Sequence, residues 1–259
     1  MEAAKTRLEE LGKGTLPNCI KVISKNLTAS TNTDIAKLAQ SGAGSWTVVH
    51  ALEQSSGRGR HGNKWISQKG DLFLSILLRP ATATKCWGEL SFVSAVAVAT
   101  TLESYVSEEK VEVKWPNDIL LDEQKVSGIL LERHDDNKFG SAIIIGIGIN
   151  ILNKPAVNKY PVTCLTDYAD SVVSVDDVLK ILLSSMLHWY ELWEVQGFAE
   201  IRREWMRRAY KLGGLVKIPG EGGQIENLEF RGIDIDGAML LKGTNGQVTK
   251  VRTGTVNFL

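Results

Sequence analysis

The feature that most constrains the fold of this chain is a run of short β segments between residues 111 and 150. The first segment alternates polar and apolar residues and is closed by Pro116, which cannot continue a central strand. Turns are expected at Asp122-Glu123 and at residues 135–137. The pattern predicts consecutive strands of one sheet. These expected strands are Val111–Trp115, Asp118–Leu121, Lys125–Glu132 and Ser141–Asn150.

Helical and strand patterns flank this run. Ile35, Leu38 and Ala39 recur at helical spacing, which predicts a short helix over residues 33–41 capped by Thr31 or Thr33. The alanine-rich stretch Leu90–Tyr105 predicts a buried helix. Further segments expected are strands over residues 45–51 and 71–78, a helix capped by Asp176 or Asp177, and a helix from Gly197 to about Lys211.

The chain changes character after Gly213-Gly214, where the short β segments VKI, ENLEFRGID, GAMLLK and QVTKV are separated by glycine turns. Strands this short need closure or a partner sheet to bury one face, which predicts a small β barrel. The expected fold class is therefore α+β, with one domain over residues 1–212 and a small β domain over residues 213–259.

Composition excludes several classes of protein. Lys plus Arg and Asp plus Glu each number 30, so no overall field attracts the chain to nucleic acid or an anionic membrane. The three cysteines stand far apart and the four histidines are scattered, which argues against disulfides and against a Cys or His metal site. The first residues, MEAAKTRLEE, lack the apolar core of a signal peptide. We expect a cytoplasmic protein with no membrane partner.

A loop rich in glycine and arginine follows Gln54. Gly57, Arg58, Gly59 and Arg60 stand in a stretch that has no acidic residue as far as Gly70. Glycines allow the backbone to approach a ligand and to adopt positive φ, and arginines offer bidentate donors to carboxylates or phosphates. The loop predicts an anion site, with a solvated basic loop or a nucleic-acid contact as the alternatives.

A second cluster combines Lys114, Asn117 and Asp118 with Lys125 and Gly128. Two strands joined by a tight turn bring both lysines and the aspartate together on the sheet. A half-buried lysine needs an anionic partner or ligand, so a purely structural Lys–Asp pair is the alternative. Gly128 removes a side chain beside Lys125, where a flat ligand would then lie against the backbone.

Two weaker signals complete the set. The segment GIGIN ends in Asn150, whose amide offers a donor and an acceptor to an adenine edge, although small residues beneath a helix explain it equally well. Hydroxyl and amide groups gather at Ser30, Thr31 and Asn32. These residues suit a helix N-cap, or hydrogen bonds to a polar ring such as a ureido group.

Taken in this order, the segments resemble the biotin–protein ligase family. The matching elements are STN at Ser30–Asn32, QSSGRGRHG at Gln54–Gly62, KWPND at Lys114–Asp118, KVSGILLE at Lys125–Glu132 and GIGIN at Gly146–Asn150. RGIDIDGAMLL at Arg231–Leu241 also resembles the small SH3-like β domain of that family. The resemblance implies a catalytic domain similar to class II aminoacyl-tRNA synthetases and lipoate ligases, with a mixed sheet flanked by helices.

The resemblance further implies an activity and a set of roles. Biotin and MgATP would form biotinyl-5′-adenylate, and a lysine of a biotin carboxyl carrier domain of acetyl-CoA carboxylase or another carboxylase would then attack it. Lys125, Asp118, Arg60 and Lys114 would be catalytic. Biotin would be bound by Ser30, Thr31, Asn32, Gln54, Gly57, Arg58, Arg60, Lys125 and Gly128. The nucleotide would be bound by Arg58, Arg60, Trp65, Asn117, Lys125 and Asn150.

Some family features are absent or left open. Ser127 and His61 depart modestly from the family pattern, and neither is an assigned charged group. The residues before Ser30 are too few for a DNA-binding winged helix of about 60 residues, so we expect no DNA partner. The protein ligands of Mg²⁺ are not indicated, and a homodimer stays open. Alternatives are a lipoate–protein ligase, a nucleic-acid-binding module and a non-catalytic biotin sensor.

Overall fold

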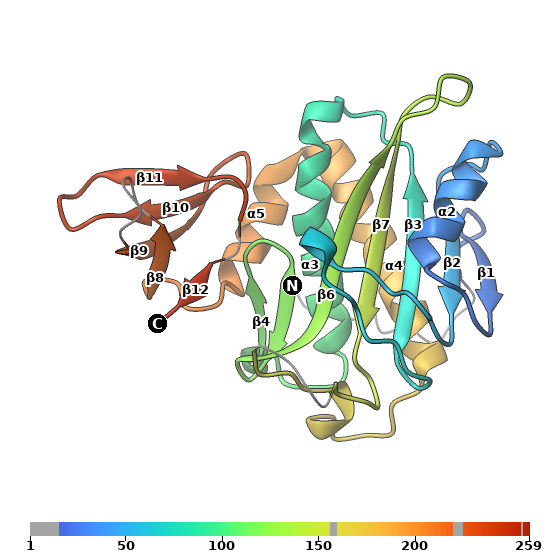
Figure 1. Ribbon diagram of the computed structural model, residues 1–259, viewed down its shortest axis with the longest axis horizontal. Coiled ribbons are helices and arrows are strands. Elements are labelled where there is room, and N and C mark those ends of the chain that lie inside the picture. The colour runs from blue at the N-terminus through green and yellow to red at the C-terminus, as the bar shows by residue number, and fades with distance from the viewer. Residues whose placement is uncertain (1–15, 156–159, 220–224, 255) are drawn as a thin grey trace.

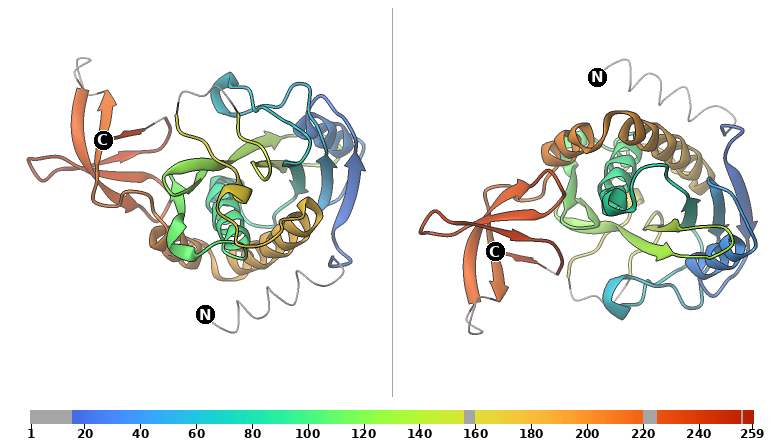
Figure 2. Two further views of the ribbon diagram at one scale, coloured as in Figure 1. Left: turned by 90° about the horizontal axis from the view of Figure 1, so that it is seen from below. Right: turned by 90° about the horizontal axis from the view of Figure 1, so that it is seen from above.

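The computed structural model describes residues 16–155, 160–219, 225–254 and 256–259 of the chain. A seven-stranded sheet with helices on both faces forms the larger part, and a five-stranded sheet follows it near the C-terminus (Figure 1). Figure 2 shows this second sheet standing beside the first, next to the hairpin at its edge. The α+β class expected from the order of segments is confirmed.

The large sheet is mixed, as predicted. Its β1 and β2 pair in parallel and every other neighbouring pair is antiparallel. The strands stand in the order β1-β2-β3-β7-β6-β5-β4. In this order their bounds are Lys21–Lys25, Thr47–Ala51, Leu72–Leu78, Ala142–Ile149, Gln124–His134, Asp118–Leu121 and Val111–Lys114.

Two layers of helices cover the sheet. On one face α2 (Thr31–Gln40) packs Ile35 and Ala39 against Val49, Leu77 and Ile144. On the other face lie α3 (Leu90–Leu102), α4 (Val175–Gln196) and α5 (Phe198–Arg207). The sheet, α4 and α5 enclose α3, and its sequence is apolar on all sides. This agrees with the prediction of a buried helix.

The central strand β7 shows why both faces can be covered. Its odd-numbered isoleucines from Ile143 to Ile149 belong to the core under α3 and α4. Its even-numbered residues face α2, and there Ile144 is followed by Gly146 and Gly148. The face beneath α2 is therefore apolar at one end of the strand and without side chains at the other.

The second sheet is antiparallel, with the strand order β11-β10-β9-β8-β12. It is joined to the larger part of the molecule by hydrogen bonds from Trp115 Nε1, next to β4, to the Gly237 carbonyl at 3.1 Å and from Arg202 Nε of α5 to the Ile233 carbonyl at 2.7 Å. A small C-terminal β domain is thus confirmed. In order β8 to β12 its strands are Leu215–Pro219, Ile225–Ile233, Met239–Lys242, Val248–Val251 and Asn257–Phe258.

Several helix ends differ from the sequence expectation, among them that of α3, which ends at Leu102 instead of Tyr105. Ser174, not Asp176 or Asp177, is the N-cap of α4, and its hydroxyl accepts the amide of Asp177. The helix α2 begins at Thr31 rather than at residue 33, because the Thr31 amide finds an acceptor in the Gln54 side chain.

The helix α5 ends at Arg207 instead of near Lys211. The next residues extend the edge of the sheet: the Arg208 carbonyl accepts from the Val113 amide and the Tyr210 amide donates to the Val113 carbonyl. The residues from Arg208 to Tyr210 therefore pair with Val113, although their sequence pattern had predicted a helix. Within the described residues, no helix combines the length and apolar character of a membrane span.

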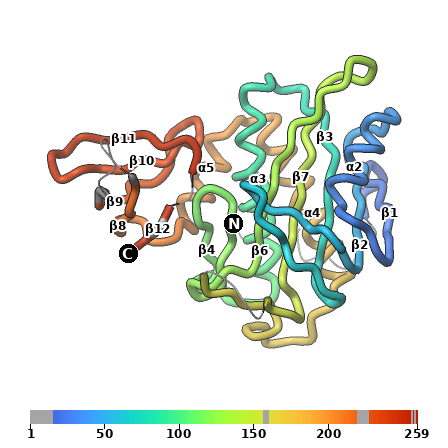
Figure 3. The backbone as a smooth tube through the Cα atoms, viewed as in Figure 1, coloured from blue at the N-terminus to red at the C-terminus, as the bar shows by residue number. Residues whose placement is uncertain are grey.

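The described residues also contain four short 3₁₀ turns. The first of them lies in the glycine–arginine loop, which crosses in front of β6 and β7 as the blue-to-cyan segment between β2 and β3 (Figure 3). The 3₁₀ turns are Arg60–Gly62, Thr84–Glu89, Glu108–Lys110 and Leu165–Asp167.

Candidate active site

A row of directly opposed residues crosses the sheet on the face that carries α2. Phe73 pairs with Gly148, Gly148 with Gly128, Gly128 with Asp118, and Asp118 with Lys114. Opposed residues of neighbouring strands point to the same face. The two glycines therefore leave a floor of bare backbone, with a carboxylate and a lysine at one end.

Lys125 joins this row through a salt bridge. Its Nζ lies 2.6 Å from Asp118 Oδ1, and the side chains are 13% and 25% exposed. The same Nζ lies 5.6 Å from the centre of the Trp65 ring and 5.3 Å from that of Tyr160. The expected meeting of Lys125 and Asp118 is confirmed, and aromatic faces limit the water around the ammonium.

Lys114 lies at the other side of Asp118, toward the C-terminal sheet. Its Nζ is 5.8 Å from the ring centres of Tyr210 and Phe258. Burial lowers the pKa of Lys114; the Asp118 carboxylate opposes this shift, and the positive charges of Lys125 and Lys211 add to it. A cation held in this way gains strongly from an incoming anion.

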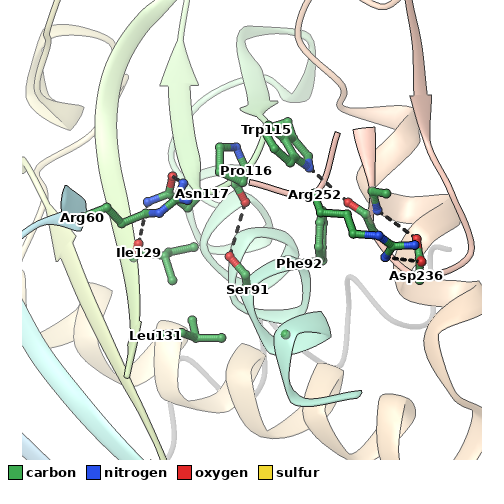
Figure 4. Close-up of a pocket in the computed structure, with 13 residues that line it drawn as sticks. Arg60, Ser91, Phe92, Trp115, Pro116, Asn117, Ile129, Leu131, Asp236 and Arg252 are labelled. Carbon is green, nitrogen blue, oxygen red and sulfur yellow. Dashed lines mark hydrogen bonds and ion pairs between the residues drawn. The ribbon is translucent and has the colours of Figure 1, made fainter. Parts of the chain in front are cut away.

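Arg60 lies above a pocket between the two sheets (Figure 4). Its Nη1 donates to Asn117 Oδ1 at 3.0 Å, and Asn117 Nδ2 donates to the Ile129 carbonyl at 2.6 Å. Burial lowers the pKa of Arg60, and the Asp118 charge opposes the shift. Asp236 and Arg252, an ion pair from the C-terminal sheet, line the far wall of the same pocket of about 310 Å³.

The glycine–arginine loop folds back on itself as a narrow hairpin. Arg58 bridges Lys64, and the Gly57 carbonyl accepts the Trp65 amide at 3.0 Å. A Cβ at Gly57 would lie 2.5 Å from the Trp65 carbonyl oxygen. Close backbone approach thus explains Gly57. Of the three loop glycines for which positive φ was expected, Gly62 adopts it, next to His61, and Gly57 and Gly59 do not.

The hairpin lays the Trp65 ring on the glycine floor. A Cβ at Gly148 would come within 2.5 Å of this ring, and one at Gly128 within 2.9 Å. The flat group against Gly128 is therefore an indole of the chain itself. Trp65 Nε1 is buried and has no hydrogen-bond partner among the described residues.

The start of α2 supplies buried polar groups beside this floor. Ser30, Thr31 and Asn32 are each at most 4% exposed. Gln54 Oε1 accepts from the Thr31 amide at 2.8 Å, and Gln54 Nε2 donates to Ser67 Oγ at 3.0 Å. Ser30 occupies the cap position without a side-chain cap bond. The hydroxyls and amides are therefore not consumed in capping the helix.

Asn150 directly follows β7, and its backbone amide donates to the carbonyl of Val126, the residue after Lys125. Its Nδ2 donates to the Thr163 carbonyl at 2.9 Å, and the Thr163 amide in turn donates to the Lys125 carbonyl at 3.0 Å. The side chain is 3% exposed. This anchors Asn150 in the wall of the site, with its Oδ1 as the group that remains for a ligand's amino group.

The structure separates two residues that the sequence had placed together. Arg60 turns to Asn117, whereas Arg58 Nη2 donates to Glu132 Oε2 at 2.8 Å. The sequence analysis gave no role to Glu132 or to Ser75, the residue paired with Gly146. A signal existed for each: Glu132 ends the KVSGILLE motif, and Ser75 is the polar residue inside the apolar run LFLSILL.

Comparison with known proteins identifies the family. A model described as the biotin/lipoate A/B protein ligase family matches residues 24–150. A biotin–[acetyl-CoA-carboxylase] ligase of Paracoccus denitrificans is 34% identical over 226 residues, which cover 85% of this chain and 93% of that protein. The chain belongs to this ligase family.

Two further relatives agree with this family membership. The bifunctional ligase/repressor BirA of Bacillus subtilis is 30% identical over 92% of this chain and 74% of that protein. A biotin protein ligase from Aquifex aeolicus, solved in complex with biotin and ATP, superposes with a TM-score of 0.79 and 28% identity, covering 92% and 98% of the two chains. The family and fold that the ordered motifs predict are confirmed.

Proposed function

We propose that this chain is an ATP-dependent biotin–protein ligase that forms biotinyl-5′-AMP and transfers biotin to a lysine of a biotin carboxyl carrier protein or domain. One observation carries the proposal: the Lys125–Asp118 pair lies beside a glycine floor, between Arg60 with Asn117 and the buried polar groups of α2. This order suits a ligand with a polar ring, an apolar chain and an anionic end.

The residue roles follow the order of groups along the floor. Thr31, Asn32 and Gln54, with Ser30, would bind the biotin ring. Gly57 and Gly128 would serve biotin indirectly, by leaving room for the Trp65 backbone and ring beside the ligand. Arg58 would close the loop over biotin and the nucleotide. Those assigned to the nucleotide are Arg60, Trp65, Asn117, Lys125 and Asn150, and Lys125 would also contact the biotin carboxylate.

In the first reaction, an oxygen of the biotin carboxylate attacks the α-phosphorus of ATP, and the bond to pyrophosphate breaks. Negative charge develops on the phosphoryl oxygens. Lys125, Arg60 and Lys114 are cations already held in place by their surroundings, so they need little rearrangement to stabilise it. The loop hairpin over the floor would exclude water from the product.

In the second reaction, the amine of the carrier lysine attacks the acyl carbon of the adenylate. A C–N bond forms, the C–O bond to AMP breaks, and the amine loses a proton. Asp118 already accepts an ammonium from Lys125. This carboxylate would orient the second amine.

Magnesium is expected to accompany ATP. The described residues contain no group of three or more His, Cys, Asp or Glu side chains arranged for a metal ion. Mg²⁺ is commonly held by one or two carboxylates and the substrate phosphates, and Asp118 fits that mode. The ion would screen the phosphate charges.

The buried polar groups favour biotin over lipoate. A cyclic urea offers two N–H donors and a carbonyl acceptor, whereas a dithiolane ring offers neither. A dithiolane would form no hydrogen bond with Thr31, Asn32 or Gln54, whereas a cyclic urea can pair with the hydroxyl and amide groups of these residues. The lipoate alternative is therefore not favoured.

Several broader expectations stay predictions. We propose the domain division at residues 212 and 213, a carrier domain of acetyl-CoA carboxylase or a related carboxylase as partner, and a cytoplasmic location. The absence of a DNA partner also stays a prediction, and part of its basis lies in residues 1–15, outside the described part. A homodimer stays open.

The first reaction can be tested alone by measuring ATP–pyrophosphate exchange with biotin or lipoate. Biotin should support exchange and lipoate should not. Lys125→Ala should reduce exchange by about 10²–10³-fold, because a preorganised cation at the developing charge is lost. Lys69→Ala, an exposed lysine of the same loop, is the matched control and should keep wild-type exchange. Exchange with lipoate alone would contradict the proposal.

A further inference from the structure

Glu132 connects the start of α2 to the glycine–arginine loop. Its Oε2 accepts from Asn32 Nδ2 at 2.7 Å and from Arg58 Nη2 at 2.8 Å. Asn32 belongs to the buried polar groups beside the glycine floor, and Arg58 belongs to the hairpin above it. One carboxylate oxygen therefore contacts both halves of the proposed biotin pocket.

The hydrogen bonds continue from Asn32 into the sheet. Ser75 Oγ lies 2.5 Å from Asn32 Oδ1 and 2.7 Å from Thr31 Oγ1, and Ser75 is fully buried. The Thr31 amide then donates to Gln54 Oε1. The chain of contacts runs from Arg58 through Glu132, Asn32, Ser75 and Thr31 to Gln54.

The negative charge at Glu132 fixes the orientation of Asn32. A carboxylate only accepts, so Asn32 must turn its NH₂ toward Glu132 and its Oδ1 toward Ser75. Asn32 Oδ1 has no proton, so the single hydroxyl proton of Ser75 points to Asn32. The Thr31 hydroxyl has two acceptors for its own proton, Ser75 Oγ at 2.7 Å and Gln54 Oε1 at 3.2 Å.

The same contacts determine what Thr31 offers a ligand. Its hydroxyl proton is used by Ser75 or by Gln54 Oε1, so the hydroxyl oxygen has only lone pairs left. A group that accepts and cannot donate suits the N–H of a cyclic urea and rejects a carbonyl oxygen at the same place. Hydrogen-bond polarity of this kind discriminates strongly between ligands because a mismatch leaves a buried polar group unpaired.

The exposure of the Arg58–Glu132 ion pair indicates whether Glu132 stabilises the fold or orients its neighbours. The side chains of Arg58 and Glu132 are 47% and 32% exposed. An ion pair this exposed contributes little to folding. The contacts of Glu132 are therefore better explained by orienting Asn32 and holding the loop than by stabilising the fold.

We propose that Glu132 is a positioning residue that fixes the orientation of the Asn32 amide in the biotin-ring pocket and ties the pocket to the glycine–arginine loop. The inference rests on the proposed biotin-ligase function.

The test is Glu132→Gln, which keeps the shape but removes the charge and lets the side chain present an N–H to Asn32. Biotin is titrated into the full chain without ATP by calorimetry. The dissociation constant for biotin should rise at least about tenfold. Glu132→Asp, which keeps the acceptor-only character, should recover part of the loss. The KM for ATP should stay within about twofold of wild type.

Glu229→Gln is the matched control. Glu229 is a strand carboxylate that accepts from Arg231 at 2.8 Å and is 35% exposed, close to the 32% of Glu132, but it lies in the C-terminal sheet. It should leave biotin binding unchanged, and both Gln variants should keep a wild-type melting temperature.

Unchanged biotin affinity in Glu132→Gln, or a loss that only follows a fall in melting temperature, would overturn the role of Glu132. Wild-type protein that fails to bind biotin at all would instead overturn the proposed function, and the inference with it.

Discussion

At the scale of single residues, the site depends on two glycines whose lack of a side chain leaves room for an aromatic ring. Gly128 and Gly148 face each other across β6 and β7, and the Trp65 ring rests on both. A side chain at either position would push the ring away from Lys125. The floor therefore holds the Trp65 ring beside Lys125.

Gly148→Ala tests this floor. The added methyl group would lie 2.5 Å from the present position of the Trp65 ring, so ring and ligand cannot both keep close contact with the strand. We expect the KM for biotin to rise about tenfold, the scale of a packing clash of 1–3 kcal/mol. Steady-state kinetics of adenylate formation measure it.

The control is Gly44→Ala. Gly44 has no atom within 4 Å of an added Cβ and no positive φ. It should retain wild-type kinetics. A wild-type KM in Gly148→Ala would show that ligands do not use the floor.

At the scale of secondary-structure elements, most strands of the large sheet could be predicted from the sequence. The strand Asp118–Leu121 and its turn at Asp122-Glu123 agree with the structure, where both turn residues adopt positive φ. Alternation, proline and turn residues are local signals, so they can be read without knowing the fold. The clustering of Lys114, Asp118 and Lys125 followed from the same local hairpins.

The elements that could not be predicted depend on distant partners. The edge strand β1 was missed because its short sequence KVISK carries a weak pattern and is defined by parallel pairing with β2. The end of α5 is set by pairing with Val113, about a hundred residues earlier. Arg58 and Glu132 are likewise joined only by the fold. Local sequence does not contain such contacts.

At the scale of the whole molecule, the C-terminal sheet is attached beside the site rather than apart from it. Trp115 of the KWPND motif donates to the Gly237 carbonyl, and Phe258 contacts Lys114. Arg252 lines the pocket that also contains Arg60 and Asn117 (Figure 4). The junction between the C-terminal sheet and the site consists of these contacts. Disturbing this junction should therefore affect catalysis as well as stability.

Gly237→Ala tests the junction. Gly237 has φ +78°, and an added Cβ would lie 2.5 Å from the Phe92 ring of α3. Strain and collision together should lower the melting temperature by about 5–15 °C and reduce kcat. Thermal unfolding and initial rates measure the two effects.

Gly246→Ala is the matched control for backbone strain. Gly246 has φ +82° but no atom within 4 Å of an added Cβ. It should lower the melting temperature by only about 2–5 °C and leave kcat unchanged. Equal effects of the two substitutions would indicate that the junction contact with Phe92 is unimportant.

The most direct test of the central claim is the mass of a biotin carboxyl carrier domain after incubation with the purified protein, biotin and MgATP, with pyrophosphate release followed in parallel. We predict a mass gain of one biotin on the carrier, together with pyrophosphate release, and loss of both in Lys125→Ala. Neither signal with biotin, but carrier modification with lipoate in its place, would contradict the assignment as a biotin–protein ligase.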